Sequence, residues 1–259
     1  MGHFYLKGGK PFYKIEKITE PGVYKDTTLS DVKKLWVKNQ LCVPGVTTII
    51  SIFDKGGLNK WIIGQHLKQA FNCDVSVLSY TLGSTAEFSD YKKEIIKLAQ
   101  KEMSLVRDAG NDFHRLMENY INGTTEDWEL PEKVYETIKS ETGSKDFIAE
   151  KSFATELYGG SVDLHSDDGN WVIDYKTKNK NNFKPGKMVY EENIMQLSAY
   201  REGLGLTNAK CANVFICLDT QKIDFHVHPE KELEKGKHLF HHALQIWYIR
   251  NRADHCQKR

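Results

Sequence analysis

Two aspartates and a lysine occupy two neighbouring segments of the chain in which apolar and polar residues alternate. Asp163 lies in the first segment, and Asp174 and Lys176 lie in the second. Asp168-Gly169 stands between the segments, and this pair is typical of a two-residue hairpin turn. The turn predicts a register in which Asp163 faces Asp174. Because side chains alternate along a strand, Lys176 is expected on the same face as Asp174.

Facing carboxylates repel each other unless a cation lies between them, and Mg²⁺ or Mn²⁺ are cations that carboxylate oxygens bind. The pattern therefore predicts a site for one or two divalent ions beside Lys176. Such a site suits phosphodiester hydrolysis, because the ion polarises the phosphate and lowers the pKa of water, while the lysine orients that water or offsets developing charge. The alternative is a solvated hairpin with ordinary surface acids. The apolar run 171–173 before Asp174 favours a buried strand instead.

Two further pairs of polar residues have helical spacing. His114 and Glu118 are four residues apart, so they share a helix face, and Gln196 and Tyr200 are related in the same way. A lone histidine in such a helix is more often a hydrogen-bonded core residue than a metal ligand. Glu118 could support a ligand or pair on the surface, and the second pair could form a polar cap on an amphipathic helix.

Four motifs occur in a fixed order over about residues 110–200. They are Gly110-Asn111-Asp112-Phe113-His114 followed by Glu118, then Gly159-Gly160-Ser161-Val162-Asp163-Leu164, Asp174-Tyr175-Lys176-Thr177, and Gln196-Leu197-Ser198-Ala199-Tyr200. This ordered set resembles the PD-(D/E)xK nuclease superfamily and, within it, the RecB-like exonuclease branch. The segment 43–49, VPGVTTI, is similar to an N-terminal motif of viral and mitochondrial members of that branch.

The resemblance implies a metal-dependent DNA exonuclease acting on single-stranded DNA or duplex ends in recombination, replication or repair. It implies a restriction-endonuclease-like α/β core, a central mixed sheet flanked by helices. It also implies roles for individual residues. Asp163, Asp174, His114 and the Tyr175 backbone carbonyl would bind the metal, Lys176 would act on the water or phosphate, and Gln196 and Tyr200 would lie near the nucleic acid.

Residues around the predicted strands add secondary candidates. Glu150 stands where a first core strand should begin, so it could approach the metal or simply end that strand. Five lysines and no acid occur from residue 176 to 187. This run predicts a loop whose Lys178 and Lys180 contact phosphates, since such contacts position a nucleic-acid strand. A solvated loop is the alternative.

Composition limits the class of protein. The chain has 259 residues and a net charge of +1, which does not suggest a globally basic nucleic-acid coat. No segment approaches the ~18 consecutive apolar residues of a membrane helix. The first residues lack a secretory layout and no arginine-rich transit segment is seen. We therefore expect a cytoplasmic protein, bacterial or in a virus-infected cell, rather than one of the mitochondrial matrix.

Cysteines and the C-terminal histidines suggest no additional cofactor. The five cysteines are scattered without a CxxC pair, so neither a disulfide framework nor an iron–sulfur cluster is expected. Several histidines lie near the C-terminus: His226, His228, His238, His241 and His242. Their spacing is compatible with metal ligation, but a solvated or partly buried helix face is the favoured interpretation.

Periodicity and turn residues predict the order of elements. Helices are expected over 58–71 and from about 89 to 121, the latter broken or bent near Gly110, with a loop or short helices over 73–89. A further helix should begin at Pro131. Core strands are predicted near 146–154, 159–165, 170–177, 212–218 and 222–228, with helices over 190–204 and 230–250. We predict a mostly helical N-terminal extension over 1–109 and a nuclease core over 110–259, packed as one unit.

Three rival functions stay open at this level. A structure- or sequence-specific endonuclease would share the same residues. A catalytically silent nucleic-acid-binding module is a different class, although such a protein is expected to lose the acids or the lysine. Hydrolysis of small nucleotides would leave the lysine-rich loop and the Gln196–Tyr200 helix without a use. DNA is the predicted partner in the favoured interpretation, and no membrane partner is expected.

Overall fold

The computed structural model describes residues 3–17, 19–53, 56–72, 85–124 and 129–251. These residues fall into two compact units, one of residues 1–53 and 114–259 and the other of residues 54–113. The grouping follows packing and does not test the predicted division into 1–109 and 110–259, which stays a prediction. Among the described residues, no helix is both long and apolar enough to cross a membrane.

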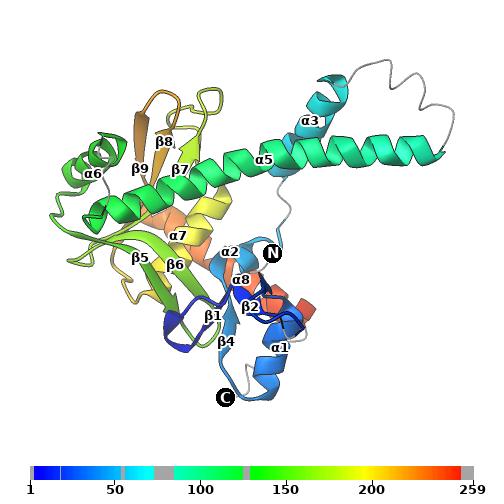
Figure 1. Cartoon of the computed structure of the whole chain (residues 1–259). Helices are drawn as coiled ribbons and strands as arrows, with labels where there is room; N and C mark the ends of the chain where they lie inside the picture. Colours follow the sequence, from blue (N-terminus) through cyan, green and yellow to red (C-terminus); the bar gives the residue numbers. More distant parts are fainter. Residues whose placement is uncertain (1–2, 18, 54–55, 73–84, 125–128, 252–259) are drawn as a thin grey trace. The chain divides into compact units, whose positions relative to one another are not determined.

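The larger unit is built on a five-stranded sheet (Figure 1). Its strands, in spatial as well as sequence order, are β5 (Phe147–Ala154), β6 (Gly159–Ser166), β7 (Trp171–Lys178), β8 (Lys210–Cys217) and β9 (Lys222–Val227). Strands β7 and β8 are parallel, while the other neighbouring pairs are antiparallel. The parallel pair needs a crossover connection, which helix α7 (Glu191–Gly203) provides.

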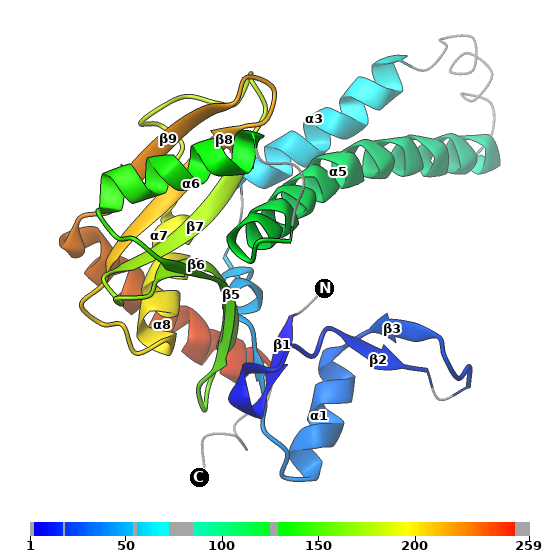
Figure 2. The same cartoon turned by 60° about the vertical axis from the view of Figure 1, so that its left-hand side comes forward.

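Helices cover both faces of this sheet. Figure 2 shows α6 (Glu129–Thr142) against one face and α7 against the other, and α8 (Glu230–Asn251) packs on α7. Strands β6 to β8 are almost entirely buried, and β8 accordingly has a nearly continuous apolar sequence. The mixed sheet and its flanking helices confirm the predicted fold class, and the five core strands and two following helices match the predicted ranges closely.

The first fifty residues add short elements to the larger unit. These are β1 (Phe4–Leu6), the 3-10 helix η1 (Lys7–Gly9), β2 (Lys14–Glu16), β3 (Tyr24–Asp26), α1 (Leu29–Val37), β4 (Cys42–Pro44) and α2 (Val46–Ile50). Strand β1 pairs with β4, and β2 pairs with β3. Helix α2 packs on α7 and α8, and Gly45 bridges Gly159 at the start of β6. The segment 43–49 therefore lies against the core.

The smaller unit contains α3 (Gly56–Asn72) and most of α5 (Thr85–Ile121). Lys68 Nζ lies 3.1 Å from Glu102 Oε2, and the Tyr91 hydroxyl donates to the Ala70 carbonyl oxygen at 3.3 Å. The predicted break at Gly110 is wrong, since α5 continues through it. A single glycine costs a helix only about 1 kcal/mol, so a long helix tolerates it. Of the loop predicted over 73–89, residues 73–84 lie outside the described part, and the rest belong to α5.

Candidate metal and phosphate site

The β6–β7 hairpin brings the two predicted aspartates to one place. Leu164 pairs with Ile173 and His165 with Val172, a register that puts Asp163 opposite Asp174. The regular pairing ends there. The backbone N–H of Tyr175 donates to Asp163 Oδ2 at 2.8 Å, so the aspartate side chain takes the place of a backbone acceptor. The strands therefore lose their regular pairing where the carboxylates lie.

The neighbouring ladder between β5 and β6 is also interrupted at Asp163. Regular pairs stand on either side, Ala149 with Leu164 and Lys151 with Val162, but Glu150 between them has a φ of 49°. A non-glycine residue rarely adopts this left-handed conformation, and such strain is often found at functional sites. Asp163 consequently lies between two irregular points of the sheet, one on each side.

His114, Glu150 and Asp163 converge at these points. One potential ligand atom from each residue lies within 4.8 Å of the other two. His114 Nδ1 is 3.3 Å from Asp163 Oδ1, and Glu150 Oε2 accepts a hydrogen bond from the Ser161 hydroxyl at 2.9 Å. Glu150, a secondary candidate in the sequence, is thus part of the cluster. Glu118, half-buried on α5, is close enough for its charge to raise the pKa of Glu150.

The acids in the cluster have unusual proton affinities. Burial and the charge of Asp163 raise the pKa of Glu150 to about 7. Burial would also raise the pKa of Asp163, but His114 and Lys176 together with the Tyr175 N–H hold it below its usual value. The pKa of Asp174 is raised, chiefly by burial. Burial would lower the pKa of His114, yet the Asp163 carboxylate keeps it above its usual value. Without a bound cation, Glu150, Asp174 and His114 therefore retain protons more readily than usual, whereas Asp163 loses its proton more readily.

Asp174 is held from two sides but keeps one oxygen free. Its Oδ2 is 2.5 Å from Lys176 Nζ and accepts a hydrogen bond from Asn213 Nδ2 at 2.7 Å. Its Oδ1 is buried and has no hydrogen-bond partner among the described residues. A buried, unsatisfied carboxylate oxygen is costly. A cation would satisfy it, so the residues present fit a divalent ion held by Asp163 and Asp174 with His114 and Glu150.

Lys176 connects the acids to helix α7. Its Nζ donates to Gln196 Oε1 at 3.3 Å, and Gln196 Nε2 donates to the Tyr200 hydroxyl at 2.9 Å. The predicted shared face of Gln196 and Tyr200 is therefore present. Tyr200 packs so closely on β6 that a Cβ at Gly160 would come within 2.8 Å of its ring. This contact gives the second glycine of the predicted motif a packing reason.

Adjacent residues of β7 reach opposite sides of the sheet. The Tyr175 ring meets the His114 ring edge-on at a centroid distance of 5.7 Å, while Lys176 meets α7. The C-terminal end of α5 and helix α7 therefore approach the aspartates from opposite faces, as alternation along the strand requires. Coordination by the Tyr175 carbonyl stays a prediction.

The two lysines predicted to contact phosphates differ in position. Lys178 is half-buried, with its Nζ 5.5 Å from the Tyr190 ring centre and 5.9 Å from that of Phe215. Burial and then the charge of Lys176 lower the pKa of Lys178, which places it near the site. Lys180 is exposed and is anchored through its backbone N–H, which donates to Asp219 Oδ2 at 2.6 Å. Lys178 is thus within range of the charge of Lys176, and phosphate contacts by Lys178 and Lys180 stay a prediction.

Asn213 was missed by the sequence analysis. His228, assigned there to a solvated or partly buried helix face, instead lies buried between β9 and α8. Asn213 Oδ1 lies 2.8 Å from His228 Nε2, and both side chains are buried. The available signal for Asn213 was its place inside the otherwise apolar run 211–217 of β8. The contact of Asn213 with Asp174 joins β8 to β7, so it could not be read from local spacing.

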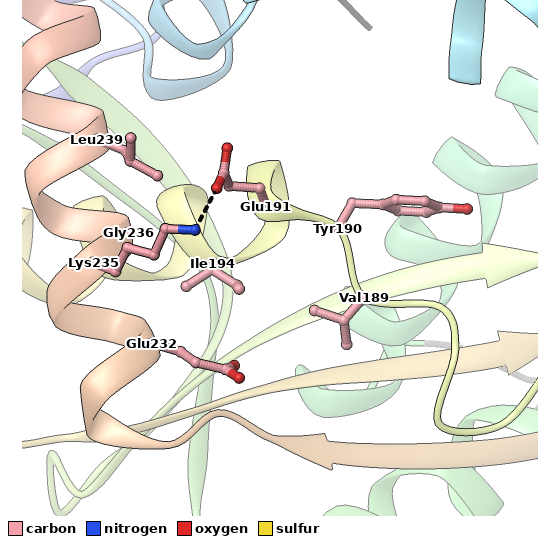
Figure 3. A pocket seen from close by; sticks show the side chains of 8 residues that line it. All are labelled: Val189, Tyr190, Glu191, Ile194, Glu232, Lys235, Gly236 and Leu239. Carbon is pink, nitrogen blue, oxygen red and sulfur yellow. Dashed lines mark hydrogen bonds and ion pairs between the residues drawn. The ribbon is translucent and has the colours of Figure 1, made fainter. Parts of the chain in front are cut away.

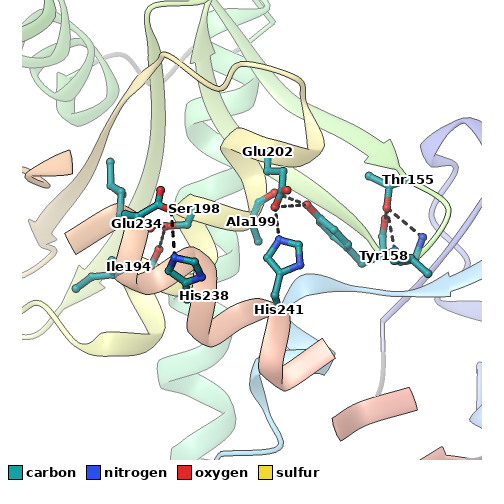
Figure 4. A network of polar contacts seen from close by, with 11 residues as sticks. Thr155, Tyr158, Ile194, Ser198, Ala199, Glu202, Glu234, His238 and His241 are labelled. Atoms are coloured by element: carbon teal, nitrogen blue, oxygen red, sulfur yellow. Dashed lines mark hydrogen bonds and ion pairs between the residues drawn. The ribbon is translucent and has the colours of Figure 1, made fainter. Parts of the chain in front are cut away.

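Two other features of this unit share no residue with the cluster of His114, Glu150 and Asp163. Figure 3 shows a cavity of about 190 Å³ between α7 and α8, where Lys235 pairs with Glu191 at 2.8 Å; none of its lining residues belongs to the cluster. Figure 4 shows His238 paired with Glu234 at 3.2 Å and His241 paired with Glu202 at 2.7 Å. These two helix histidines therefore lie beside glutamates on a partly exposed face, as favoured from the sequence.

Comparisons with known proteins give only distant likenesses. No protein-family model and no curated protein sequence matches this chain. Among solved structures, SSO0001 has 12% sequence identity and a TM-score of 0.29, covering 70% of this chain and 84% of the other. An alkaline exonuclease from Laribacter hongkongensis has 19% identity and the same TM-score of 0.29, covering 55% of this chain and 84% of its own.

Proposed function

We propose that this protein is a divalent-metal-dependent nuclease that hydrolyses DNA phosphodiester bonds, and that it works as an exonuclease on single-stranded DNA or duplex ends. One observation carries the proposal. The buried Oδ1 of Asp174, which has no hydrogen-bond partner among the described residues, lies next to the group of His114, Glu150 and Asp163, with Lys176 at its border. A group rich in carboxylates beside one lysine suits a hard cation and a phosphate together.

Asp163 and Asp174, with His114 and Glu150, would hold Mg²⁺ or Mn²⁺. When bound, such an ion polarises the phosphate and lowers the pKa of the attacking water. Asp163 is prepared for this role because its Oδ2 is fixed by the Tyr175 N–H, leaving Oδ1 directed at His114. Asn213 fixes Asp174 in the same manner from the neighbouring strand.

Lys176 would act on the water or on the phosphate. Its Nζ is held between Asp174 Oδ2 and Gln196 Oε1, so its position is set by two acceptors on different elements. A preorganised cation stabilises the charge that develops on the phosphate oxygens more than a mobile one does. Gln196 and Tyr200 extend the hydrogen-bond chain from Lys176 along α7, where they would help to position the DNA strand. Lys178 would add a phosphate contact.

The test compares end-labelled linear and circular single-stranded DNA, with Mg²⁺, Mn²⁺ or EDTA, for the wild type and Asp174→Asn. We expect cleavage that needs both a metal and an open end, and a variant that binds DNA without cutting it. Cleavage of the circular DNA would show that the protein is an endonuclease rather than an exonuclease. Binding by the wild type without cleavage in either metal would support the silent binding module, and cleavage persisting in EDTA would refute the metal mechanism.

A further inference from the structure

A second group of potential ligands lies where β9 leads into α8. His226, His228 and Glu232 each place one ligand atom within 4.8 Å of the other two. The histidines are two residues apart in extended chain, so their side chains share one side, with ring centroids 4.8 Å apart. Glu232 follows in the first turn of α8. None of these residues belongs to the candidate nuclease site.

Hydrogen bonding fixes which nitrogen of His228 carries its proton. The Asn213 amide nitrogen donates to the Asp174 carboxylate, so Asn213 Oδ1 is the atom that faces His228 Nε2 at 2.8 Å. An amide oxygen can only accept, and Nε2 must therefore donate to it. In the neutral imidazole, the proton on Nε2 leaves a lone pair on Nδ1.

This Nδ1 lone pair faces the other potential ligands. His228 is only 3% exposed, and its Nδ1 has no hydrogen-bond partner among the described residues. The nearest carboxylate oxygen, Glu232 Oε2, is 3.7 Å away and is also an acceptor. The ring is buried, and burial lowers its pKa because it disfavours the charged form. Two acceptors directed at each other leave a buried polar atom unsatisfied, and a cation between them removes that cost.

We propose that His226, His228 and Glu232 form a binding site for Zn²⁺ or a similar borderline transition-metal ion, separate from the nuclease site. Two imidazole nitrogens and one carboxylate oxygen suit Zn²⁺, whereas Mg²⁺ prefers oxygen ligands. Zn²⁺ binds nitrogen and oxygen ligands at about 2.0–2.2 Å from the ion, so the three ligand atoms would have to move closer to one another. Glu232 has a side chain 48% exposed and His226 is half-buried, so these two can close onto an ion beside the fixed His228.

The direction of the hydrogen bond from His228 to Asn213 supports this assignment. Metal-binding histidines usually donate their second ring N–H to an oxygen acceptor, which fixes the tautomer and the ring orientation. His228 already donates Nε2–H to Asn213 Oδ1 and is further held by its backbone N–H, which donates to the Cys211 carbonyl oxygen at 2.9 Å. The outer support of a zinc ligand is therefore in place.

The experiment measures Zn²⁺ binding by calorimetry and metal analysis in a His114→Gln/Asp163→Asn background, which disables the first cluster. We expect about one equivalent of Zn²⁺ to remain bound. Adding His226→Gln and Glu232→Gln should weaken binding at least about 100-fold, more than the loss typical of an outer-shell partner. The matched control adds Glu234→Gln and His238→Gln, which removes an exposed pair of the same residue types on α8 and should leave Zn²⁺ binding unchanged.

A Co²⁺-substituted sample provides a second measurement, because coordination by imidazole changes the visible absorption of the ion. The residues that distinguish these variants from the background, His226 and Glu232 or Glu234 and His238, are exposed or half-buried, so we expect them to fold like the background protein. A thermal unfolding curve of each variant verifies this. Absence of Zn²⁺ binding in the background protein would overturn the proposal. Retention of the same affinity after His226→Gln and Glu232→Gln would overturn it as well, since the ion would then be held elsewhere.

Discussion

Two clusters of ligating residues lie in the larger unit, and they differ in the atoms they offer. Among the described residues, the cluster around Asp163 contains His114 of α5 and the carboxylates of Glu150 and Asp163, with that of Asp174 beside them. The cluster at β9 and α8 contains two imidazoles and one carboxylate. The first is bordered by Lys176, which can meet a phosphate. The comparison teaches that one sheet can offer an oxygen-rich site suited to catalysis and a nitrogen-rich site suited to tight binding.

Loss of a carboxylate at the first cluster should have the largest effect. Asp174→Asn is expected to reduce DNA cleavage at least about 10³-fold, because a divalent ion contributes several kcal/mol and each 1.36 kcal/mol is about tenfold in rate. The measurement is release of label from end-labelled single-stranded DNA. Glu234→Gln/His238→Gln serves as the control and should cleave like the wild type. Equal cleavage by Asp174→Asn and the wild type would remove the first cluster from the mechanism.

Removal of the lysine should separate catalysis from metal binding. Lys176→Met is expected to lower the cleavage rate about 10²-fold, the usual loss of one transition-state contact, while Mn²⁺ affinity is retained or increased. Affinity is retained because the change removes a cation next to Asp174 and leaves every proposed ligand in place. Calorimetry with Mn²⁺ and single-turnover cleavage test both parts. A loss of Mn²⁺ binding would show that Lys176 holds the site together rather than acting on DNA.

Asn213 contacts both clusters, so one substitution tests their connection. Asn213→Ala removes the hydrogen bond to Asp174 and the acceptor of His228. We expect Mn²⁺ affinity at the first cluster and Zn²⁺ affinity at the second each to fall about 10–100-fold, as for other outer-shell partners. Both are measured by calorimetry, with circular dichroism as the check on folding. An effect at one cluster alone would show that the two sites are independent.

The smallest effect concerns the stability of the metal-free protein. The pKa of Glu150 is raised to about 7 in the folded protein, so its folded form holds the proton more tightly than its unfolded form. Stability from this group is therefore full below the ordinary glutamate pKa and is lost as pH rises through about 7. In EDTA at pH 8, Glu150→Gln should be more stable than the wild type by on the order of 1–3 kcal/mol.

Urea unfolding at pH 5 and pH 8 measures this difference. At pH 5 the advantage of Glu150→Gln should be largely gone, because the wild-type residue is protonated there. Adding Mg²⁺ at pH 8 should raise the free energy of unfolding of the wild type but not that of the Glu150→Gln variant. An advantage that is the same at both pH values would show that burial of charge at Glu150 is not the cause.

Local sequence signals were sufficient for the hairpin. The predicted register is present, but the two-residue turn at Asp168-Gly169 is wrong, because β6 ends at Ser166 and β7 begins at Trp171. The Gly169 N–H donates to the Ser166 carbonyl oxygen at 3.0 Å, and Gly169 adopts a φ of 72°. Alternation then placed Asp163, Asp174 and Lys176 together, and four-residue spacing aligned Gln196 with Tyr200. These features depend on neighbours in sequence, which is why they could be predicted.

Other parts depend on contacts that no local pattern records. Strands β1 to β4 have three residues each, too few to show a period of two. The left-handed backbone of Glu150 is imposed by its surroundings, so its place in the cluster was visible only as one of two options. The pairing of Asn213 with Asp174 and with His228 spans 39 and 15 residues, which puts it beyond spacing arguments.

The backbone amide of Tyr175 provides a reporter that needs no added probe. Its hydrogen is held by a side chain rather than by the adjacent strand, and that side chain is a proposed ligand. Any ion that draws electron density from Asp163 must change the strength of this one bond. The ¹⁵N–¹H signal of residue 175 and its exchange with deuterium should therefore follow occupancy of the site even in a variant that cannot cut DNA.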